Sequence, residues 1–328
     1  MKTCLGTKLI RLSSLFFLAA AMFTTGAQKH GATMQGMKVA CVQLDVTADL
    51  NENADRIIRH IESEARQKVR LVVFPECALT SYDVGIIGRL TQGEIDSALD
   101  RIRQACRTFN IYAVVGSAFT RDSRWYNGAF VMDPQGRVIK RYAKMHVVKP
   151  LFTNGNELAI FQIDDVPATI MICHDERYPE IFRIPVLAGA RIGIYIGSES
   201  RRLSKRDDYR SQIMARATEN RISVIQCNAG DGGPDGGSHG HSRVIDSRGN
   251  ILAEAGSRVG EVIRATIHPG QSSNEWARAG AETPSLRQFW EEGLRVLRSQ
   301  NPEFFRDSQA ERGTAAEANK SNPGSERR

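Results

Sequence analysis

Short apolar runs alternate with segments of helical periodicity from residue 37 to residue 267, and this alternation constrains the fold more than any other feature. Runs such as 71–74, 168–172 and 192–196 are apolar except for Thr169 and end at polar or turn residues. Between such runs, apolar residues recur every three or four positions, which is the periodicity of a helix with one buried face. Strands that are apolar throughout belong to sheets covered on both faces. The pattern predicts an α/β fold with mixed β-sheets over residues 37–270.

The N-terminal residues differ from this pattern. Basic residues precede an apolar run at 12–23, and small residues follow it: Lys2, Lys8, Arg11, Thr25 and Ala27. This order is typical of a secretory signal peptide over residues 1–27, with 28–36 as a linker, and predicts a secreted or periplasmic protein. The run is too short to span a bilayer, so we expect no stable membrane insertion. The alternative is a true start at Met34 or Met37, which would leave the protein in the cytoplasm.

The periodic pattern weakens beyond residue 270. We expect a C-terminal extension at 271–306 with one amphipathic helix, formed around residues 289–297. Residues 307–328 are rich in Ala, Glu, Asn, Ser and Arg and offer little apolar surface to bury. Such a composition predicts a disordered tail.

Charge and cysteine usage narrow the function classes. The net charge is +7, but acidic and basic residues are interspersed and no long basic run alternates with aromatic residues, so no nucleic-acid partner is expected. Without the leader, five cysteines remain, an odd number at wide spacing: Cys41, Cys77, Cys106, Cys173 and Cys227. This is neither a disulfide framework nor a zinc-site spacing. At least one thiol is therefore expected to be free.

Three chemically capable side chains follow directly after predicted strands. Glu76 follows the run at 71–74, Lys144 follows 138–142, and Cys173 follows 168–172. In open α/β sheets, sites form outside the carboxyl ends of the strands. Each residue alone has an ordinary structural explanation, as a cap, a surface lysine or a small buried hydrophobe. Their local sequences distinguish them.

Three segments carry these residues: LVVFPE at 71–76, RYAKMH at 141–146 and IMICHDERYPE at 170–180. In this order they resemble the three signature motifs of the nitrilase superfamily, also called carbon–nitrogen hydrolases. Further matches occur at 152–155, 216–220 and 240–246, so the resemblance covers residues 37–267. It implies an αββα sandwich with mixed β-sheets, its four layers completed on dimerisation, and a homodimer or higher homo-oligomer.

The resemblance also implies a role for each residue. Glu76 would be the general base and acid, Lys144 the oxyanion stabiliser and Cys173 the nucleophile, with the backbone N–H of His174 as a second oxyanion donor. The chemistry is coherent, because an ammonium favours a thiolate and a carboxylate can accept the thiol proton. We therefore expect hydrolysis of a non-peptide C–N bond, amide or carbamoyl, in a small molecule. The reaction proceeds through a thioester, releases ammonia or an amine, and requires no metal or organic cofactor.

The chain departs from the family pattern in two places. Many members carry a second glutamate between the lysine and the FxxG segment, but 145–151 contains none, and Glu157 does not match that position. True nitrilases usually have Trp after the nucleophile, whereas this chain has His174, which favours amidase or carbamoylase chemistry. The missing glutamate supports one alternative, a catalytically silent relative that serves as a binding or scaffold protein.

Other polar residues are weaker candidates. Tyr82, Ser198 and Arg201 are candidates for lining the pocket. Arg201 there would favour a substrate with an acidic group, and the alternative is that Arg201 belongs to a solvated loop. A Cys–His dyad is disfavoured, because neighbours on an extended chain point to opposite sides and His174 would face away from Cys173. His239 and His241, which flank a glycine-rich loop, are expected to order that loop or line the entrance.

Overall fold

The computed structural model describes residues 36–199, 203–232, 234 and 236–300. The expected signal peptide at 1–27, the linker up to residue 35 and the expected tail at 307–328 lie outside the described residues. Among the residues that it does describe, no helix combines the length and the hydropathy needed to cross a membrane.

The first half of the chain builds one six-stranded sheet with helices on its outer side. Its elements are β1 (Met37–Val42), α1 (Leu50–Arg66), β2 (Leu71–Val73), α2 (Val84–Ile87), α3 (Gln92–Phe109), β3 (Tyr112–Arg121), β4 (Arg124–Met132) and β5 (Val138–Ala143). Together with β12 (Val262–Ile267), the strands lie in the order β12-β1-β2-β3-β4-β5. β1, β2 and β3 are parallel to their neighbours in this group, and the remaining pairs are antiparallel.

The second half builds a second six-stranded sheet. Its elements are β6 (Phe161–Ile163), β7 (Val166–Ile172), the 3₁₀ helix η1 (Cys173–Arg177), α4 (Pro179–Leu187), β8 (Ile192–Gly197), α5 (Leu203–Asn220), β9 (Ser223–Asn228), β10 (Arg243–Ile245) and β11 (Ile251–Glu254). The order is β11-β10-β9-β8-β7-β6, with a parallel centre formed by β7, β8 and β9. Both sheets are therefore mixed, as predicted.

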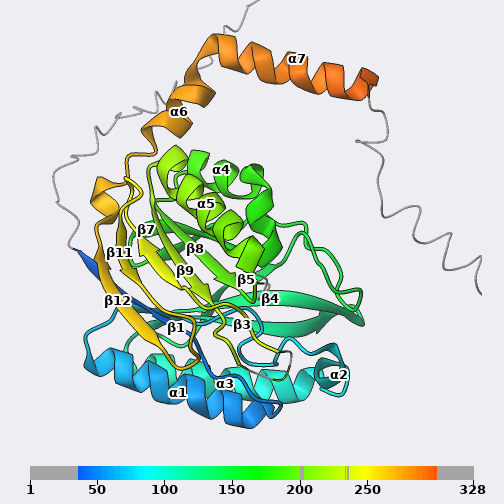
Figure 1. The fold of residues 1–328 in the computed structure, drawn as a ribbon, viewed down its shortest axis with the longest axis vertical. Coiled ribbons are helices and arrows are strands. Elements are labelled where there is room, and N and C mark those ends of the chain that lie inside the picture. The colour runs from blue at the N-terminus through cyan, green and yellow to red at the C-terminus, as the bar shows by residue number, and fades with distance from the viewer. Residues whose placement is uncertain (1–35, 200–202, 233, 235, 301–328) are drawn as a thin grey trace, which may run out of the picture. The chain divides into compact units, whose positions relative to one another are not determined.

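The two sheets pack face to face, and helices cover their outer faces (Figure 1). α1 and α3 pack on the first sheet through residues such as Ile57 and Ile102, while α4 and α5 cover the second through Phe182 and Ile213. The apolar layer between the sheets includes fully buried residues from both halves of the chain. The expected αββα sandwich is confirmed, but one chain supplies all four layers. The expectation that dimerisation completes them was wrong, because a single chain folds into two sheets, each covered by its own helices.

The helix boundaries follow from local capping. Asp49 precedes α1, and its side chain accepts hydrogen bonds from the amides of Asn51 and Glu52. Thr91 and Glu94 form a capping box at the start of α3, which satisfies amides that have no partner within the helix. α3 ends where Asn110 adopts a left-handed conformation with φ 53°.

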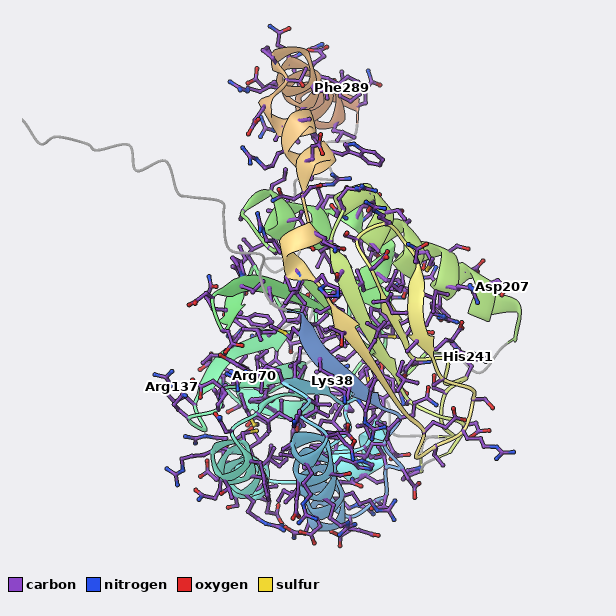
Figure 2. The ribbon with its side chains drawn as sticks, turned by 90° about the vertical axis from the view of Figure 1, so that its left-hand side faces the viewer. Lys38, Arg70, Arg137, Asp207, His241 and Phe289 are labelled. Carbon is purple, nitrogen blue, oxygen red and sulfur yellow. The ribbon has the colours of Figure 1, made fainter. Side chains whose placement is uncertain are left out.

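The C-terminal extension differs from the expectation of one helix. After η2 (Pro269–Gln271) it contains two helices, α6 (Glu275–Glu282) and α7 (Pro284–Gln300), of which α7 includes the predicted segment. The break falls at Thr283, because Pro284 cannot continue a helix but suits its first turn. α6 contacts α4 and α5. Phe289 on α7 is 70% exposed (Figure 2).

Candidate active site

The three predicted residues follow strands of different sheets. Glu76 and Lys144 come after β2 and β5 of the first sheet, and Cys173 comes directly after β7 of the second. The backbone at Glu76 lies very close to β3. A Cβ added to Gly116 would lie 2.1 Å from the Pro75 carbonyl oxygen and 2.8 Å from the Cα of Glu76. A glycine at this position therefore allows the segment carrying Glu76 to pack against the sheet.

Glu76 and Lys144 form an ion pair with no solvent exposure on either side chain. The Lys144 Nζ lies 2.7 Å from Oε1 of Glu76. The side-chain amide of Asn127 donates to the same oxygen at 2.6 Å, and the backbone N–H of Ser198 donates to Oε2 at 2.8 Å. Both carboxylate oxygens are thus hydrogen-bonded, which fixes the orientation of the group.

Lys144 is held as a buried cation. Burial by itself disfavours the ammonium, but the neighbouring Cys173 and Glu76 outweigh it and raise the pKa of Lys144 well above its ordinary value. Its backbone is fixed on both sides: the N–H donates to the Asn127 carbonyl at 2.8 Å, and the carbonyl accepts the Gly155 N–H at 2.7 Å. The charge therefore has a defined position next to the Glu76 carboxylate.

Cys173 occupies a sharp turn between a strand and a helix. It is the first residue of η1 and has φ 48°, a left-handed conformation that residues with a side chain rarely adopt. The residue is buried, with 8% exposure. Burial and the charge of Glu76 raise the pKa of its thiol well above the ordinary value, and Lys144 opposes this shift. The resting group is therefore a neutral thiol that needs a base to become a nucleophile.

Asp175 holds the turn that carries Cys173. Its carboxylate accepts hydrogen bonds from the Tyr142 hydroxyl at 2.8 Å, the His146 amide at 2.9 Å and the Ile172 amide at 3.2 Å. Burial raises the pKa of Asp175 to about 6, although these donors and Lys144 oppose the shift. The carboxylate thus ties η1 to the segment that follows β5.

The reason given above against a Cys–His dyad was wrong in its premise. His174 follows Cys173 in a 3₁₀ helix and not on extended chain. Its ring lies edge-on to Tyr178 with centroids 6.2 Å apart, and burial lowers its pKa. The amides in the first turn of a helix have no partner within that helix, which leaves the His174 N–H suited to bind an anion.

The structure places some of the expected pocket residues next to the ion pair, while others lie elsewhere or outside the described residues. The Tyr82 ring centroid lies 5.9 Å from the Lys144 Nζ and 4.4 Å from the Lys149 Nζ, so this ring adjoins the ion pair. Ser198 contributes its backbone amide to Glu76, as described above. Arg201 lies outside the described residues. His239 contacts Glu199, and His241 lies near Glu254 at 3.8 Å.

Asn127 and Glu199 are residues that the sequence analysis missed. Asn127 is buried and binds Glu76 through its side chain, while its carbonyl binds the Lys144 amide. A single polar residue within the apolar stretch 126–132 is the signal that could have identified it. Glu199 is also buried, and only its position after an apolar strand marked it.

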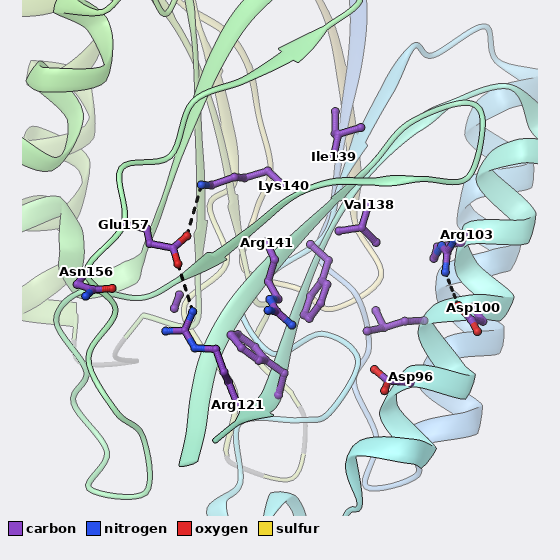
Figure 3. Close-up of a pocket in the computed structure, with 14 residues that line it drawn as sticks. Asp96, Asp100, Arg103, Arg121, Val138, Ile139, Lys140, Arg141, Asn156 and Glu157 are labelled. Atoms are coloured by element: carbon purple, nitrogen blue, oxygen red, sulfur yellow. Dashed lines mark hydrogen bonds and ion pairs between the residues drawn. The ribbon is translucent and has the colours of Figure 1, made fainter. Parts of the chain in front are cut away.

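A groove of about 660 Å³ lies on the outer face of the first sheet, away from these residues (Figure 3). It is bounded by α3, β3, β4 and β5, and several of its charged side chains form ion pairs with one another. Glu157 lies 3.2 Å from Arg121 and 3.7 Å from Lys140, and Arg103 lies 2.6 Å from Asp100 (Figure 3). Glu76, Lys144 and Cys173 do not line this groove.

Comparison with known proteins identifies the family. The family model described as carbon-nitrogen hydrolase matches residues 38–275. The chain belongs to the carbon–nitrogen hydrolase family. The 2-oxoglutaramate amidase of Bacillus subtilis (strain 168) is 31% identical over 242 residues, covering 72% of this chain and 92% of that protein. The human omega-amidase NIT2 is 23% identical over 270 residues, covering 78% and 95%.

Solved structures share the fold of this carbon–nitrogen hydrolase. Saccharomyces cerevisiae Nit3, a member of branch 10 of the nitrilase superfamily, has a TM-score of 0.68 at 24% identity and covers 78% of this chain and 97% of its own. An amidase from Nesterenkonia sp. has the same TM-score at 20% identity, with coverage of 79% and 99%. The family and its amidase members make this protein an amidase-like hydrolase of C–N bonds other than peptide bonds.

Proposed function

We propose that this hydrolase cleaves an amide or carbamoyl C–N bond of a small molecule through a thioester on Cys173. The observation that carries the proposal is the buried pair of Glu76 and Lys144, 2.7 Å apart, beside a buried thiol that starts a helix. A carboxylate, an ammonium and a thiol enclosed together are the groups that such an acyl transfer needs.

Acylation begins with a proton transfer. The Cys173 thiol gives its proton to the Glu76 carboxylate while the sulfur attacks the carbonyl carbon. The oxyanion that forms is stabilised by the Lys144 ammonium and the His174 N–H, and the loss of one such donor typically costs about 3–4 kcal/mol of barrier. Glu76 then gives its proton to the leaving nitrogen, which departs as ammonia or an amine. Such proton transfers contribute about 10²–10⁴-fold in rate.

Deacylation uses the same groups in reverse. Glu76 takes a proton from a water molecule, and the hydroxide attacks the thioester carbonyl. The sulfur leaves and recovers its proton from Glu76, while the product departs as a carboxylic or carbamic acid. The Asn127 and Ser198 hydrogen bonds keep the carboxylate in one orientation through both half-reactions.

The relatives support an amide as the substrate class. Several are amidases by name, among them a 2-oxoglutaramate amidase, omega-amidases and an (R)-stereoselective amidase from Pseudomonas sp.. In a variant of the Nesterenkonia amidase, acrylamide has undergone Michael addition at the active-site cysteine. An amide therefore reaches the cysteine of a protein with this fold.

The test is ammonia release from a panel of amides, carbamoyl compounds and nitriles. We expect turnover of at least one amide or carbamoyl compound, an acyl adduct on Cys173 by intact mass, and neither with Cys173→Ala. Cys106→Ala is the matched control, because Cys106 is also buried but lies in α3 on the outer side of the first sheet. Absence of both ammonia and adduct with the wild-type protein would leave a catalytically silent binding protein as the better interpretation.

A further inference from the structure

Glu199 is a buried carboxylate that none of the steps above uses. Its exposure is 1%, and it lies directly after β8, next to Ser198. The Tyr195 hydroxyl donates to its Oε1 at 2.6 Å, and the Gln226 side-chain amide donates to the same oxygen at 3.2 Å. The His239 Nε2 contacts Oε2. A carboxylate is costly to bury, and these polar contacts both offset that cost and fix the position of the group.

The backbone of Glu199 is fixed as well. Its N–H donates to Oδ1 of Asn228 at 3.1 Å, and its carbonyl accepts the Ser238 hydroxyl at 2.6 Å. The same hydroxyl lies 3.1 Å from Oδ1 of Asn228. Glu199 is therefore tied by its side chain and its backbone to β9 and to the loop between β9 and β10.

Ser198, the residue before Glu199, contacts the candidate active site. The Ser198 N–H donates to Oε2 of Glu76 at 2.8 Å, across 122 residues of sequence. Consecutive Cα atoms are about 3.8 Å apart, so an immobile Glu199 leaves the Ser198 amide little freedom to move. Glu76 thus receives one of its hydrogen bonds from a segment whose position Glu199 determines.

We propose that Glu199 is a positioning residue, which holds the Ser198 amide on Glu76 through its contacts with Tyr195, Gln226, Asn228 and His239. The proposal rests on the function proposed above and adds a residue to its machinery. The charge of Glu199 does not assist the nucleophile, since it contributes to raising the pKa of the Cys173 thiol. The benefit of a buried carboxylate at this position is therefore geometric.

Two substitutions separate geometry from charge. Glu199→Gln and Glu199→Ala both remove the charge, but only glutamine retains an oxygen that can accept from Tyr195 and Gln226. We expect kcat of Glu199→Ala to fall about 100-fold with KM changed less than about threefold, because a displacement near 1 Å is sufficient for such a loss. Glu199→Gln should recover at least about tenfold of that loss.

The matched control is Glu64→Gln. Glu64 is also buried and is held by Arg264 through two hydrogen bonds of 2.6 Å, but it lies in α1 on the outer side of the first sheet. The Glu64→Gln substitution should lower the stability of the protein and leave kcat unchanged. Equal kcat for Glu199→Ala and Glu199→Gln, or a loss in Glu64→Gln as large as in Glu199→Ala, overturns the proposal.

Two further measurements keep the proposal testable. If Glu199→Ala does not fold, Tyr195→Phe removes one donor to Glu199 at constant shape, and an unchanged kcat with this variant overturns the proposal. If the wild-type protein shows no turnover, the proposed function fails on its own. The rate of Cys173 alkylation by iodoacetamide then replaces kcat. The alkylation rate should be lower in Glu199→Ala than in Glu199→Gln. Equal alkylation rates in the two variants reject the positioning role.

Discussion

At the scale of single residues, the cysteines differ in their access to solvent. Cys41, Cys106, Cys173 and Cys227 are free thiols. Among the five cysteines that the structure describes, Cys173 has the largest exposure at 8%, against 1% or less for the other four. Burial raises the pKa of the Cys173 thiol, so its reactive thiolate form becomes more abundant as the pH rises.

The first prediction is therefore selective and pH-dependent labelling. Limiting iodoacetamide should alkylate Cys173 before Cys41, Cys77, Cys106 or Cys227, at a rate that increases through the alkaline range. Peptide mass mapping after short reaction times measures the order. Prior modification of Cys106, which is fully buried in α3, would contradict it.

The buried carboxyl group of Glu176 is expected to make the stability of the fold depend on pH. Neither of its carboxyl oxygens has hydrogen-bond geometry with a residue that the structure describes. Burial and the charge of Glu199 raise its pKa to about 9, and the nearby Tyr195 hydroxyl offsets this only in part. Between pH 4.5 and pH 9 the folded state therefore keeps a proton that the unfolded state has released, so stability decreases as the pH rises through this window.

Replacing this carboxyl group should remove that pH dependence. Glu176→Gln is expected to be more stable than the wild type at pH 8, with an advantage that grows by at most about 1.4 kcal/mol per pH unit and vanishes near pH 4.5. Urea denaturation at the two pH values measures the difference. Equal stability of the two proteins at pH 8 would show that Glu176 does not carry a buried proton.

At the scale of elements, a third prediction follows from the close packing of β3 against the segment 75–77, which carries Glu76. A Cβ at Gly116 would lie within 2.8 Å of three backbone atoms, which cannot move aside as a flexible side chain can. Gly116→Ala should lower kcat by at least about 100-fold, because it displaces Glu76, and should destabilise the fold by about 1–3 kcal/mol.

Gly93→Ala is the matched control for this substitution. Gly93 lies in the first turn of α3, and nothing lies within 4 Å of an added Cβ. The change should leave kcat unchanged and stabilise the protein by about 0.4–1 kcal/mol. Comparable loss of activity in both variants would mean that the distance between β3 and Glu76 is unimportant.

At the scale of the whole molecule, the apolar side chains of α7 support the expected homo-oligomer. Large apolar residues recur every three or four positions along it and are exposed in the single chain: Leu286, Phe289, Trp290, Leu294 and Leu297. Contiguous apolar surface of this kind marks interaction sites. We expect light scattering to give at least a dimer, and Phe289→Glu with Trp290→Glu to lower the mass. A wild-type monomer at micromolar concentration would refute this.

Much of the architecture could be predicted from local sequence. The runs at 71–74, 168–172 and 192–196 became β2, β7 and β8, because a strand buried between two packed layers is apolar along most of its length. Short or weakly apolar elements were missed, such as β6, whose middle residue Gln162 faces solvent, and the four-residue helix α2.

The sequence by itself determined the strand–helix alternation and the motifs that contain Glu76, Lys144 and Cys173, since both are encoded by neighbouring residues. Tertiary structure decided how the strands divide between two sheets and which groups surround these residues. The hydrogen bonds of Asn127 and Ser198 to Glu76 span 51 and 122 residues. The Asn127 contact depends on the order of the strands within the first sheet, and the Ser198 contact depends on the packing of the second sheet against it. Periodicity along the chain encodes neither.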